Sequence, residues 1–129
     1  DADIRASDAL DTVATEFSCQ GLELDFVGLC WGGDLIRAAT WRPRAFAGTA
    51  WQARGKPEAV ANRLNTYRVL LTRARYETVI WVPPGDLADH TRAPAEMDLI
   101  AAYLTTCGIA PLGDAPATTP RLSPQPALL

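Results

Sequence analysis

One segment of nineteen residues, Asn65–Pro83, restricts the fold of this chain more than any other. Its first part completes a helical repeat over Pro57–Arg75, in which the apolar side chains fall within one narrow arc at about 100° per residue. These core-facing residues are Val60, Leu64, Tyr67, Leu71 and Ala74. The following Glu77–Val82 alternates and ends at Pro83-Pro84, which predicts a strand near Thr78–Val82 that stops there. The segment therefore predicts a helix that leads into a buried strand.

The predicted helix also carries residues on the side away from its core face. Thr66, Val69 and Arg73 lie roughly opposite the apolar arc. The apolar residue on that side predicts that the helix is covered on both sides. Arg73 projects away from the main core, near the joint between helix and strand, and is the first candidate for a functional side chain.

Two more strands and a second helix are predicted around this unit. The strands are Val13–Phe17 and Leu24–Trp31, separated by a loop at Ser18–Gly21. The second strand is nearly all apolar, which is typical of a strand buried on both faces of a parallel sheet. Pro94–Cys107 has apolar residues at helical spacing and is followed by Gly108, a common helix stop.

The region between the second strand and the first helix is less regular. Ala39–Arg42 and Thr49–Ala53 predict a β-hairpin. Arginines lie among three tryptophans here, a combination that could stack bases of single-stranded nucleic acid. Tryptophans more often fill a core, and the core-filling interpretation is favoured. The three residues are Trp31, Trp41 and Trp51.

Length and composition predict one folded domain over residues 1–110. The chain has 129 residues, and from 111 to 129 it is rich in Pro, Ala and Thr, which predicts a flexible tail. The net charge is −3, whereas a nucleic-acid module that acts alone is more often basic. Any nucleic-acid binding is therefore expected to be local or shared with another domain.

Several classes of protein are excluded or disfavoured by simple counts. No apolar run approaches the roughly 20 residues of a membrane span, and no signal peptide is visible, so a cytoplasmic location is expected. Three cysteines without metal-type spacing and one histidine predict no metal site. The chain begins at Asp1, and its only methionine is Met97, so we expect it to be a piece of a longer chain or a processed product.

Two segments resemble conserved helicase motifs. Thr15–Val27, TEFSCQGLELDFV, resembles motif V of superfamily 1 helicases, and Leu71–Arg75, LTRAR, resembles motif VI, about fifty residues later. The sequences of these two segments are most similar to those of an uncharacterised family of bacterial predicted DNA/RNA helicases akin to the helicase portion of Schlafen proteins. The resemblance covers roughly Val13–Gly108. It implies an α/β fold, namely the C-terminal part of a RecA-like second helicase domain with a mainly parallel sheet.

The resemblance also implies roles for individual residues. Arg73 would be the arginine finger, a catalytic residue. The residues that would border the nucleotide are Gly21, Glu23, Arg73 and Arg75. Those that would contact nucleic acid are Thr15, Ser18 and Gln20. The residue types suit these tasks, since Gly21 lets a phosphate approach without a Cβ and Gln20 both donates and accepts. The alternative is a tight turn with a solvated Glu23 and Arg75 at the surface.

The implied activity depends on a second domain. No G-x-x-x-x-G-K-[ST] sequence occurs, so the chain lacks the loop that holds nucleotide phosphates. ATP with Mg²⁺ is therefore expected on an N-terminal RecA-like domain of the parent chain, with single-stranded nucleic acid as a further partner and no membrane. The isolated chain is expected neither to hydrolyse ATP nor to unwind a duplex.

A different class of function remains open. Thr66 occupies a place where many relatives carry another arginine, which weakens the expectation that the parent hydrolyses ATP. The alternative is a non-catalytic module that retains the helicase fold and binds protein or RNA. In that case Arg73 is expected to be held in an internal salt bridge and to face no open cleft.

Overall fold

The computed structural model describes residues 13–19, 21–113 and 128. Residues 1–12, Gln20 and most of the predicted tail, 114–127 and 129, lie outside the described residues. Five strands, two α-helices and one short 3-10 helix are present in the described part. In chain order they are β1 Leu24–Cys30, β2 Leu35–Arg37, β3 Trp41–Ala47, β4 Ala50–Ala53, α1 Pro57–Leu71, β5 Ala74–Trp81, η2 His90–Arg92 and α2 Pro94–Thr106.

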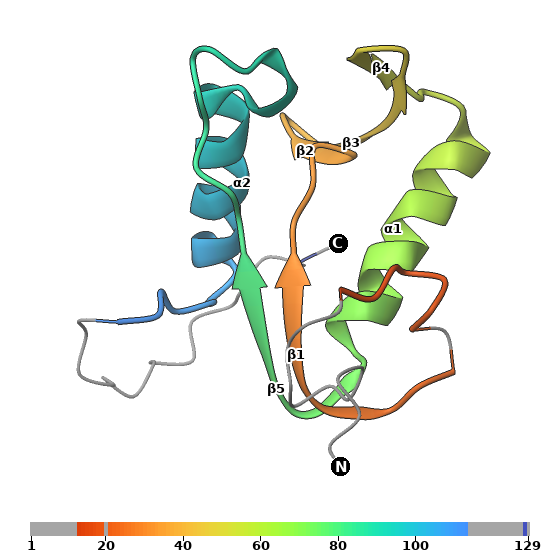
Figure 1. The fold of residues 1–129 in the computed structure, drawn as a ribbon, viewed down its shortest axis with the longest axis vertical. Coiled ribbons are helices and arrows are strands. Elements are labelled where there is room, and N and C mark those ends of the chain that lie inside the picture. Colours follow the sequence, from red (N-terminus) through yellow and green to blue (C-terminus); the bar gives the residue numbers. More distant parts are fainter. Residues whose placement is uncertain (1–12, 20, 114–127, 129) are drawn as a thin grey trace.

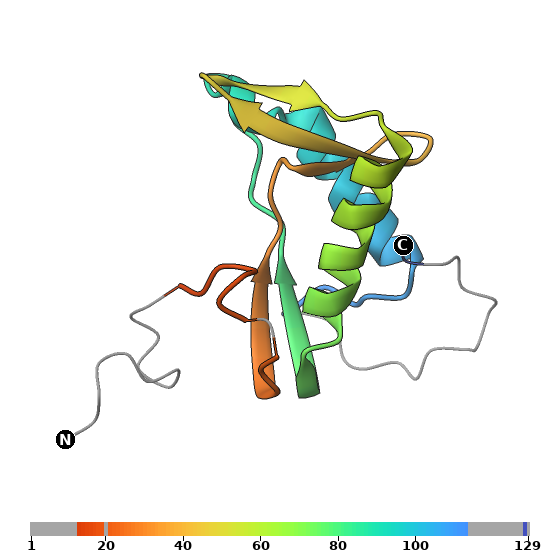
Figure 2. The same ribbon diagram turned by 90° about the vertical axis from the view of Figure 1, so that its right-hand side faces the viewer.

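The strands form two small sheets. β1 and β5 pair in parallel, with Leu29 opposite Ile80, and α1 connects the second sheet back to β5 (Figures 1 and 2). β2, β3 and β4 form an antiparallel sheet that lies across the upper ends of both helices in Figure 1. The fold is mixed α/β as predicted, and its parallel sheet is small: it contains β1 and β5, while the other three described strands form a separate antiparallel sheet.

One core joins the two sheets to both helices. Trp31 is 2% exposed and stacks on Trp41, with ring centroids 5.3 Å apart, while its indole nitrogen donates to the Leu35 carbonyl at 2.9 Å. The residues of this core are Leu29, Trp31, Leu35, Trp41, Tyr67, Met97, Ile100 and Leu104. The core-filling interpretation of Trp31 and Trp41 is therefore confirmed, and base stacking on these two rings is excluded by their burial.

Helix α1 has the predicted core face but a different end. Tyr67 is buried, and Leu64 and Leu71 pack against the core. The helix stops at Leu71, four residues before the predicted end, because the backbone leaves the helical conformation at Thr72, with φ −109° and ψ 8°, and strand β5 begins at Ala74 opposite Leu24.

The predicted strand at Val13–Phe17 does not form. Residues 16–19 form a turn, in which the Cys19 amide donates to the Thr15 carbonyl at 3.1 Å. The Thr15 hydroxyl accepts from the Ser18 amide at 3.3 Å. A hydroxyl that bonds the backbone three residues later stabilises a turn rather than a strand, which explains the error.

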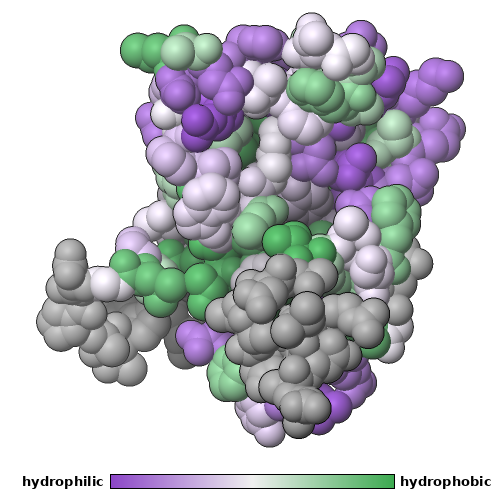
Figure 3. Space-filling model, viewed as in Figure 1, coloured by the Kyte–Doolittle hydropathy of each residue, from purple (hydrophilic) through white to green (hydrophobic). Residues whose placement is uncertain are grey.

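Strand β1 lies where it was predicted, but it is not buried on both faces. Phe26 is 68% exposed, and across the sheet Trp81 on β5 is 55% exposed. Apolar atoms gather in the middle of the face seen in Figure 3, around β1 and β5 and toward the segment that follows α2. The open face arises because α1 covers only one side of the parallel pair.

The second sheet is attached to α2 by a bidentate ion pair. Arg44 on β3 donates to both carboxylate oxygens of Glu96 at 3.0 and 2.9 Å, and its Nε donates to the Gly33 carbonyl at 2.8 Å. A hairpin forms in the predicted region, but its pairing differs: Arg44–Ala47 pair with Ala50–Ala53 around a turn at Gly48, whose φ is +62°. The predicted first strand, Ala39–Arg42, does not pair with β4, because Trp41 and Arg42 pair with β2 instead. These contacts fix the antiparallel sheet on the helices.

The end of α2 agrees with the sequence prediction. Gly108 adopts φ +94° just after the helix, as expected for a glycine stop. Beyond it, Leu128 packs against the core, and its carbonyl accepts from the Trp41 indole at 2.8 Å. Neither helix of the described part is long and apolar enough to cross a membrane.

Gly85 provides a first test of the fold. A Cβ at this position would overlap the backbone nitrogen and Cα of Pro94. Gly85→Ala is therefore expected to lower the free energy of unfolding by about 1–3 kcal/mol, as overpacking does. Gly28→Ala is the control, since nothing lies within 4 Å of its added Cβ. Urea denaturation of both variants measures the difference, and equal stabilities would contradict the packing described.

Asp89 provides a test by pH. Hydrogen bonds from the Thr91 hydroxyl, the Thr91 amide and Arg92 lower the pKa of Asp89 from 3.8 to about 2. Because the pKa is lower in the folded state, the stabilisation is present above the unfolded pKa and is lost as pH falls from 3.8 toward 2. NMR titration of the carboxyl carbon should show this low midpoint, which returns toward the ordinary value in Thr91→Ala. A midpoint unchanged between the two proteins would rule this explanation out.

Candidate nucleotide and nucleic-acid site

The fold brings the two motif-like segments side by side. The Leu24 amide donates to the Arg73 carbonyl at 3.2 Å, and Arg73 Nη1 donates to the Leu22 carbonyl at 3.1 Å. The parallel pairing continues from this point, with Leu24 opposite Ala74. Residues about fifty positions apart in the sequence thus form one continuous surface.

Arg73 lies in the turn between α1 and β5. Its side chain is half-buried, and among the described residues it forms no salt bridge. Its Nε is buried without a hydrogen-bond partner in the described structure. A guanidinium has five N–H donors, so most of the donors of Arg73 are not used by the described residues. The buried Nε is covered by protein atoms, so a ligand could reach only the Nη donors; it is the position of Arg73 on the lining of the neighbouring cavity that makes it a candidate ligand contact.

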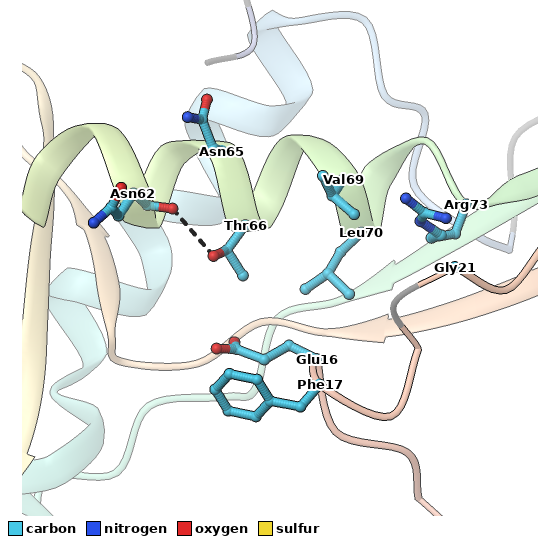
Figure 4. A pocket seen from close by; sticks show the side chains of 9 residues that line it. All are labelled: Glu16, Phe17, Gly21, Asn62, Asn65, Thr66, Val69, Leu70 and Arg73. Atoms are coloured by element: carbon cyan, nitrogen blue, oxygen red, sulfur yellow. Dashed lines mark hydrogen bonds between the residues drawn. The ribbon is translucent and has the colours of Figure 1, made fainter.

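A cavity of about 480 Å³ lies between α1 and the turn at residues 16–19 (Figure 4). This volume lies in the range of small-molecule sites. Its lining residues are Glu16, Phe17, Gly21, Asn62, Asn65, Thr66, Val69, Leu70 and Arg73. The three residues predicted to face away from the core, Thr66, Val69 and Arg73, all line this cavity, so that part of the helical analysis is confirmed.

Gly21 lies at the same end of the cavity as Arg73 in Figure 4. Its φ is +79°, a conformation that favours glycine, and no atom lies within 4 Å of the position where a Cβ would stand. The backbone here is therefore open to a ligand, in agreement with the reason for selecting Gly21 from the sequence.

Glu23 and Arg75 lie next to this cavity but do not line it. Arg75 Nη2 is 3.2 Å from Glu23 Oε2, and Arg75 Nη1 is 3.9 Å from Asp25 Oδ1. Both partners of the first pair are more than half exposed, so the pair contributes little stability. The structure thus brings these two predicted residues together as an exposed ion pair.

Two of the three predicted nucleic-acid residues, Thr15 and Ser18, lie at the turn before β1. Thr15 and Ser18 are exposed, and their hydroxyl oxygens are 2.9 Å apart. The two hydroxyls bond to each other within the turn, as expected from the tight-turn interpretation. Gln20, the third predicted residue, lies outside the described residues.

A polar network behind the cavity was not predicted from the sequence. Tyr67 donates to Asp34 Oδ1 at 2.6 Å, and Arg63 Nη1 lies 3.0 Å from Asp34 Oδ2 and 3.5 Å from Glu16 Oε2. Burial, followed by the neighbouring Asp34 carboxylate, raises the pKa of Tyr67, so the phenol remains a donor. The network connects the turn at residues 16–19 to α1 and to the start of β2.

The sequence contained a signal for some of the missed cavity residues but not for others. Asn62 lies four residues before Thr66 on the same side of α1, so the helical arc opposite the core could have identified it. Phe17 and Glu16 reach the cavity only because a turn replaces the predicted strand. Nothing in their local sequence indicates this position.

Comparison with known families identifies a helicase-related family. The family model described as Schlafen group 3, DNA/RNA helicase domain, matches residues 1–84, more than half of the 129 residues. The chain belongs to the Schlafen group 3 helicase-domain family. No curated protein and no solved structure matches the chain.

Membership in the Schlafen group 3 family confirms the helicase-related part of the sequence prediction. The matched residues include both motif-like segments, the cavity between them and strand β5. Helix α2 follows the matched region, although Met97, Ile100 and Leu104 belong to the same core. The family supports a helicase-related protein that binds nucleic acid in general terms.

Proposed function

We propose that this chain is the C-terminal part of a RecA-like second domain in a superfamily 1-type helicase ATPase. In this proposal it supplies Arg73 to a nucleotide bound mainly by an N-terminal RecA-like domain of the parent chain. The same surface contacts single-stranded DNA or RNA through Thr15, Ser18 and Gln20. The observation that carries the proposal is the Arg73 guanidinium, which lines an open cavity together with Gly21 and forms no salt bridge with the described residues.

The residues present fit one end of a nucleotide rather than a whole ATP site. Arg73 and the open backbone at Gly21 suit phosphate oxygens, whereas the sequence contains no glycine-rich lysine loop. ATP with Mg²⁺ supplies the phosphoanhydride that is hydrolysed, and the proposal assigns both to the other domain.

Arg73 suits this role for chemical reasons. A guanidinium remains charged at physiological pH and can donate to two oxygens at once, which stabilises negative charge on a transferring phosphoryl group. The hydrogen bond to the Leu22 carbonyl orients it. Glu23 and Arg75 border this region as an exposed pair that a bound nucleotide can separate at low cost.

The contacts of Arg73 favour this proposal over a non-catalytic interaction module. That alternative expects Arg73 in an internal salt bridge, and the described residues form none with it. The deciding experiment is the steady-state ATPase activity of the parent protein with Arg73→Ala. An unchanged kcat would reject the finger role and favour the module.

A further inference from the structure

We propose that the cavity between α1 and the turn at residues 16–19 binds one nucleotide unit in a fixed orientation. The base lies between Phe17, Glu16 and Asn62, and the phosphate lies at Arg73. The inference rests on the proposed function for the class of ligand, a nucleotide, and adds to it a base subsite with a preference among bases.

The charges at the two ends of the cavity set the orientation. Figure 4 shows the Glu16 carboxylate at the end near Asn62 and Thr66, and the Arg73 guanidinium at the other end beside Gly21. Asn62 and Leu70 are eight residues apart on α1, roughly 12 Å by the helix rise, and Arg73 lies beyond them. A phosphate is repelled from Glu16 and attracted to Arg73, so the base occupies the Glu16 end.

Phe17 provides a surface on which a base can stack. It is 74% exposed, although it is a large aromatic residue, and Figure 4 shows its ring across the cavity from Thr66 and Leu70. An exposed aromatic ring in a cavity that also contains an arginine is the combination that binds nucleotides, since every base has a face that stacks.

The polar groups beside Phe17 select among bases. Within the described structure the Asn62 side-chain amide has no hydrogen-bond partner, and Glu16 is bound only by Arg63 at 3.5 Å. An ionised carboxylate accepts hydrogen bonds and donates none. Glu16 therefore favours bases with an exocyclic amino group, such as adenine or cytosine, over thymine or uracil.

The test is the affinity of the full 129-residue chain for single-stranded oligo(dA) and oligo(dT) of equal length. Oligo(dA) is expected to bind more tightly. Phe17→Ala should weaken binding of both on the order of tenfold through loss of stacking. Glu16→Gln should reduce the preference for oligo(dA), because an amide donates as well as accepts. Leu87→Ala is the matched control, since Leu87 is 95% exposed and lies outside the cavity.

Competition by ATP and AMP distinguishes the two sources of a nucleotide. If either displaces oligo(dA) and loses affinity with Phe17→Ala, the cavity takes free nucleotide. If neither ATP nor AMP competes with oligo(dA), the cavity binds a nucleotide that belongs to a nucleic-acid strand. Equal effects of Phe17→Ala and Leu87→Ala, no preference between the oligonucleotides, or no binding at all would each overturn the inference. The binding experiments change Phe17 and Glu16, whereas the ATPase experiment changes Arg73, so the two proposals can fail separately.

Discussion

Arg73→Ala in the parent protein is expected to lower kcat for ATP hydrolysis by a factor that corresponds to about 2–4 kcal/mol of transition-state stabilisation. Among the described residues, the Arg73 side chain donates one hydrogen bond, from Nη1 to the Leu22 carbonyl. Removing it takes away the charge that the proposed function places at the phosphoryl group, and it leaves the backbone pairing of Leu24 with the Arg73 carbonyl in place. Steady-state ATPase assays with saturating nucleic acid measure the loss, and KM should change much less than kcat.

Two further variants identify the cause. Arg73→Lys retains the charge but not the planar fork, so it should recover only part of the activity. Arg68→Ala is the matched control, because Arg68 is an exposed arginine on α1 that donates to Asn65 Oδ1 at 3.0 Å and does not line the cavity. A loss with Arg68→Ala as large as that with Arg73→Ala would show that the effect is not specific to the finger position.

Trp31→Ala is expected to lower the free energy of unfolding by about 3–5 kcal/mol, the usual cost of truncating a large aromatic residue in a core. Trp31 is 2% exposed and contacts the rings of Trp41 and Tyr67 at centroid distances of 5.3 and 4.5 Å. Its loss leaves a void where the two sheets meet and leaves the Leu35 carbonyl without its indole donor. Urea denaturation followed by circular dichroism measures the change.

The chain contains a control of the same residue type. Trp81 is 55% exposed on β5, so Trp81→Ala is expected to cost about 1 kcal/mol or less. Trp31→Phe should retain most of the packing and fall between the two. Similar losses for Trp31→Ala and Trp81→Ala would mean that the core is not organised around Trp31.

Local periodicity predicted the helices well. The core faces of α1 and α2 and the glycine stop at Gly108 follow from the positions of apolar residues and from one backbone conformation. The side of α1 that carries Thr66 and Val69 was also correct, since side-chain direction in a helix depends on spacing, and Arg73, just beyond the helix, lines the same cavity. The resemblance to a Schlafen-like helicase family was likewise identified from two short segments, Thr15–Val27 and Leu71–Arg75.

Boundaries and sheet composition were predicted less well, for two reasons. The Thr15 hydroxyl bonds the Ser18 amide, which stabilises a turn where a strand was predicted. The predicted helix is shorter because β5 begins at Ala74 and pairs with Leu24, a contact between residues far apart in the sequence. The apolar run of β1 indicated burial on both faces, whereas α1 covers only one face of the described sheet. The apolar composition of a strand does not determine whether other elements cover one of its faces or both.

The amino-acid order was sufficient for the helices, the two motif-like segments and Arg73 as the leading candidate, because these depend on contacts between near neighbours in the chain. The cavity depended on tertiary structure. It exists because the parallel pairing of β1 and β5 places Leu22 against Arg73 and the turn at Phe17 against α1. Contacts between residues so far apart in the sequence form only when the chain folds, so no local sequence pattern predicts them.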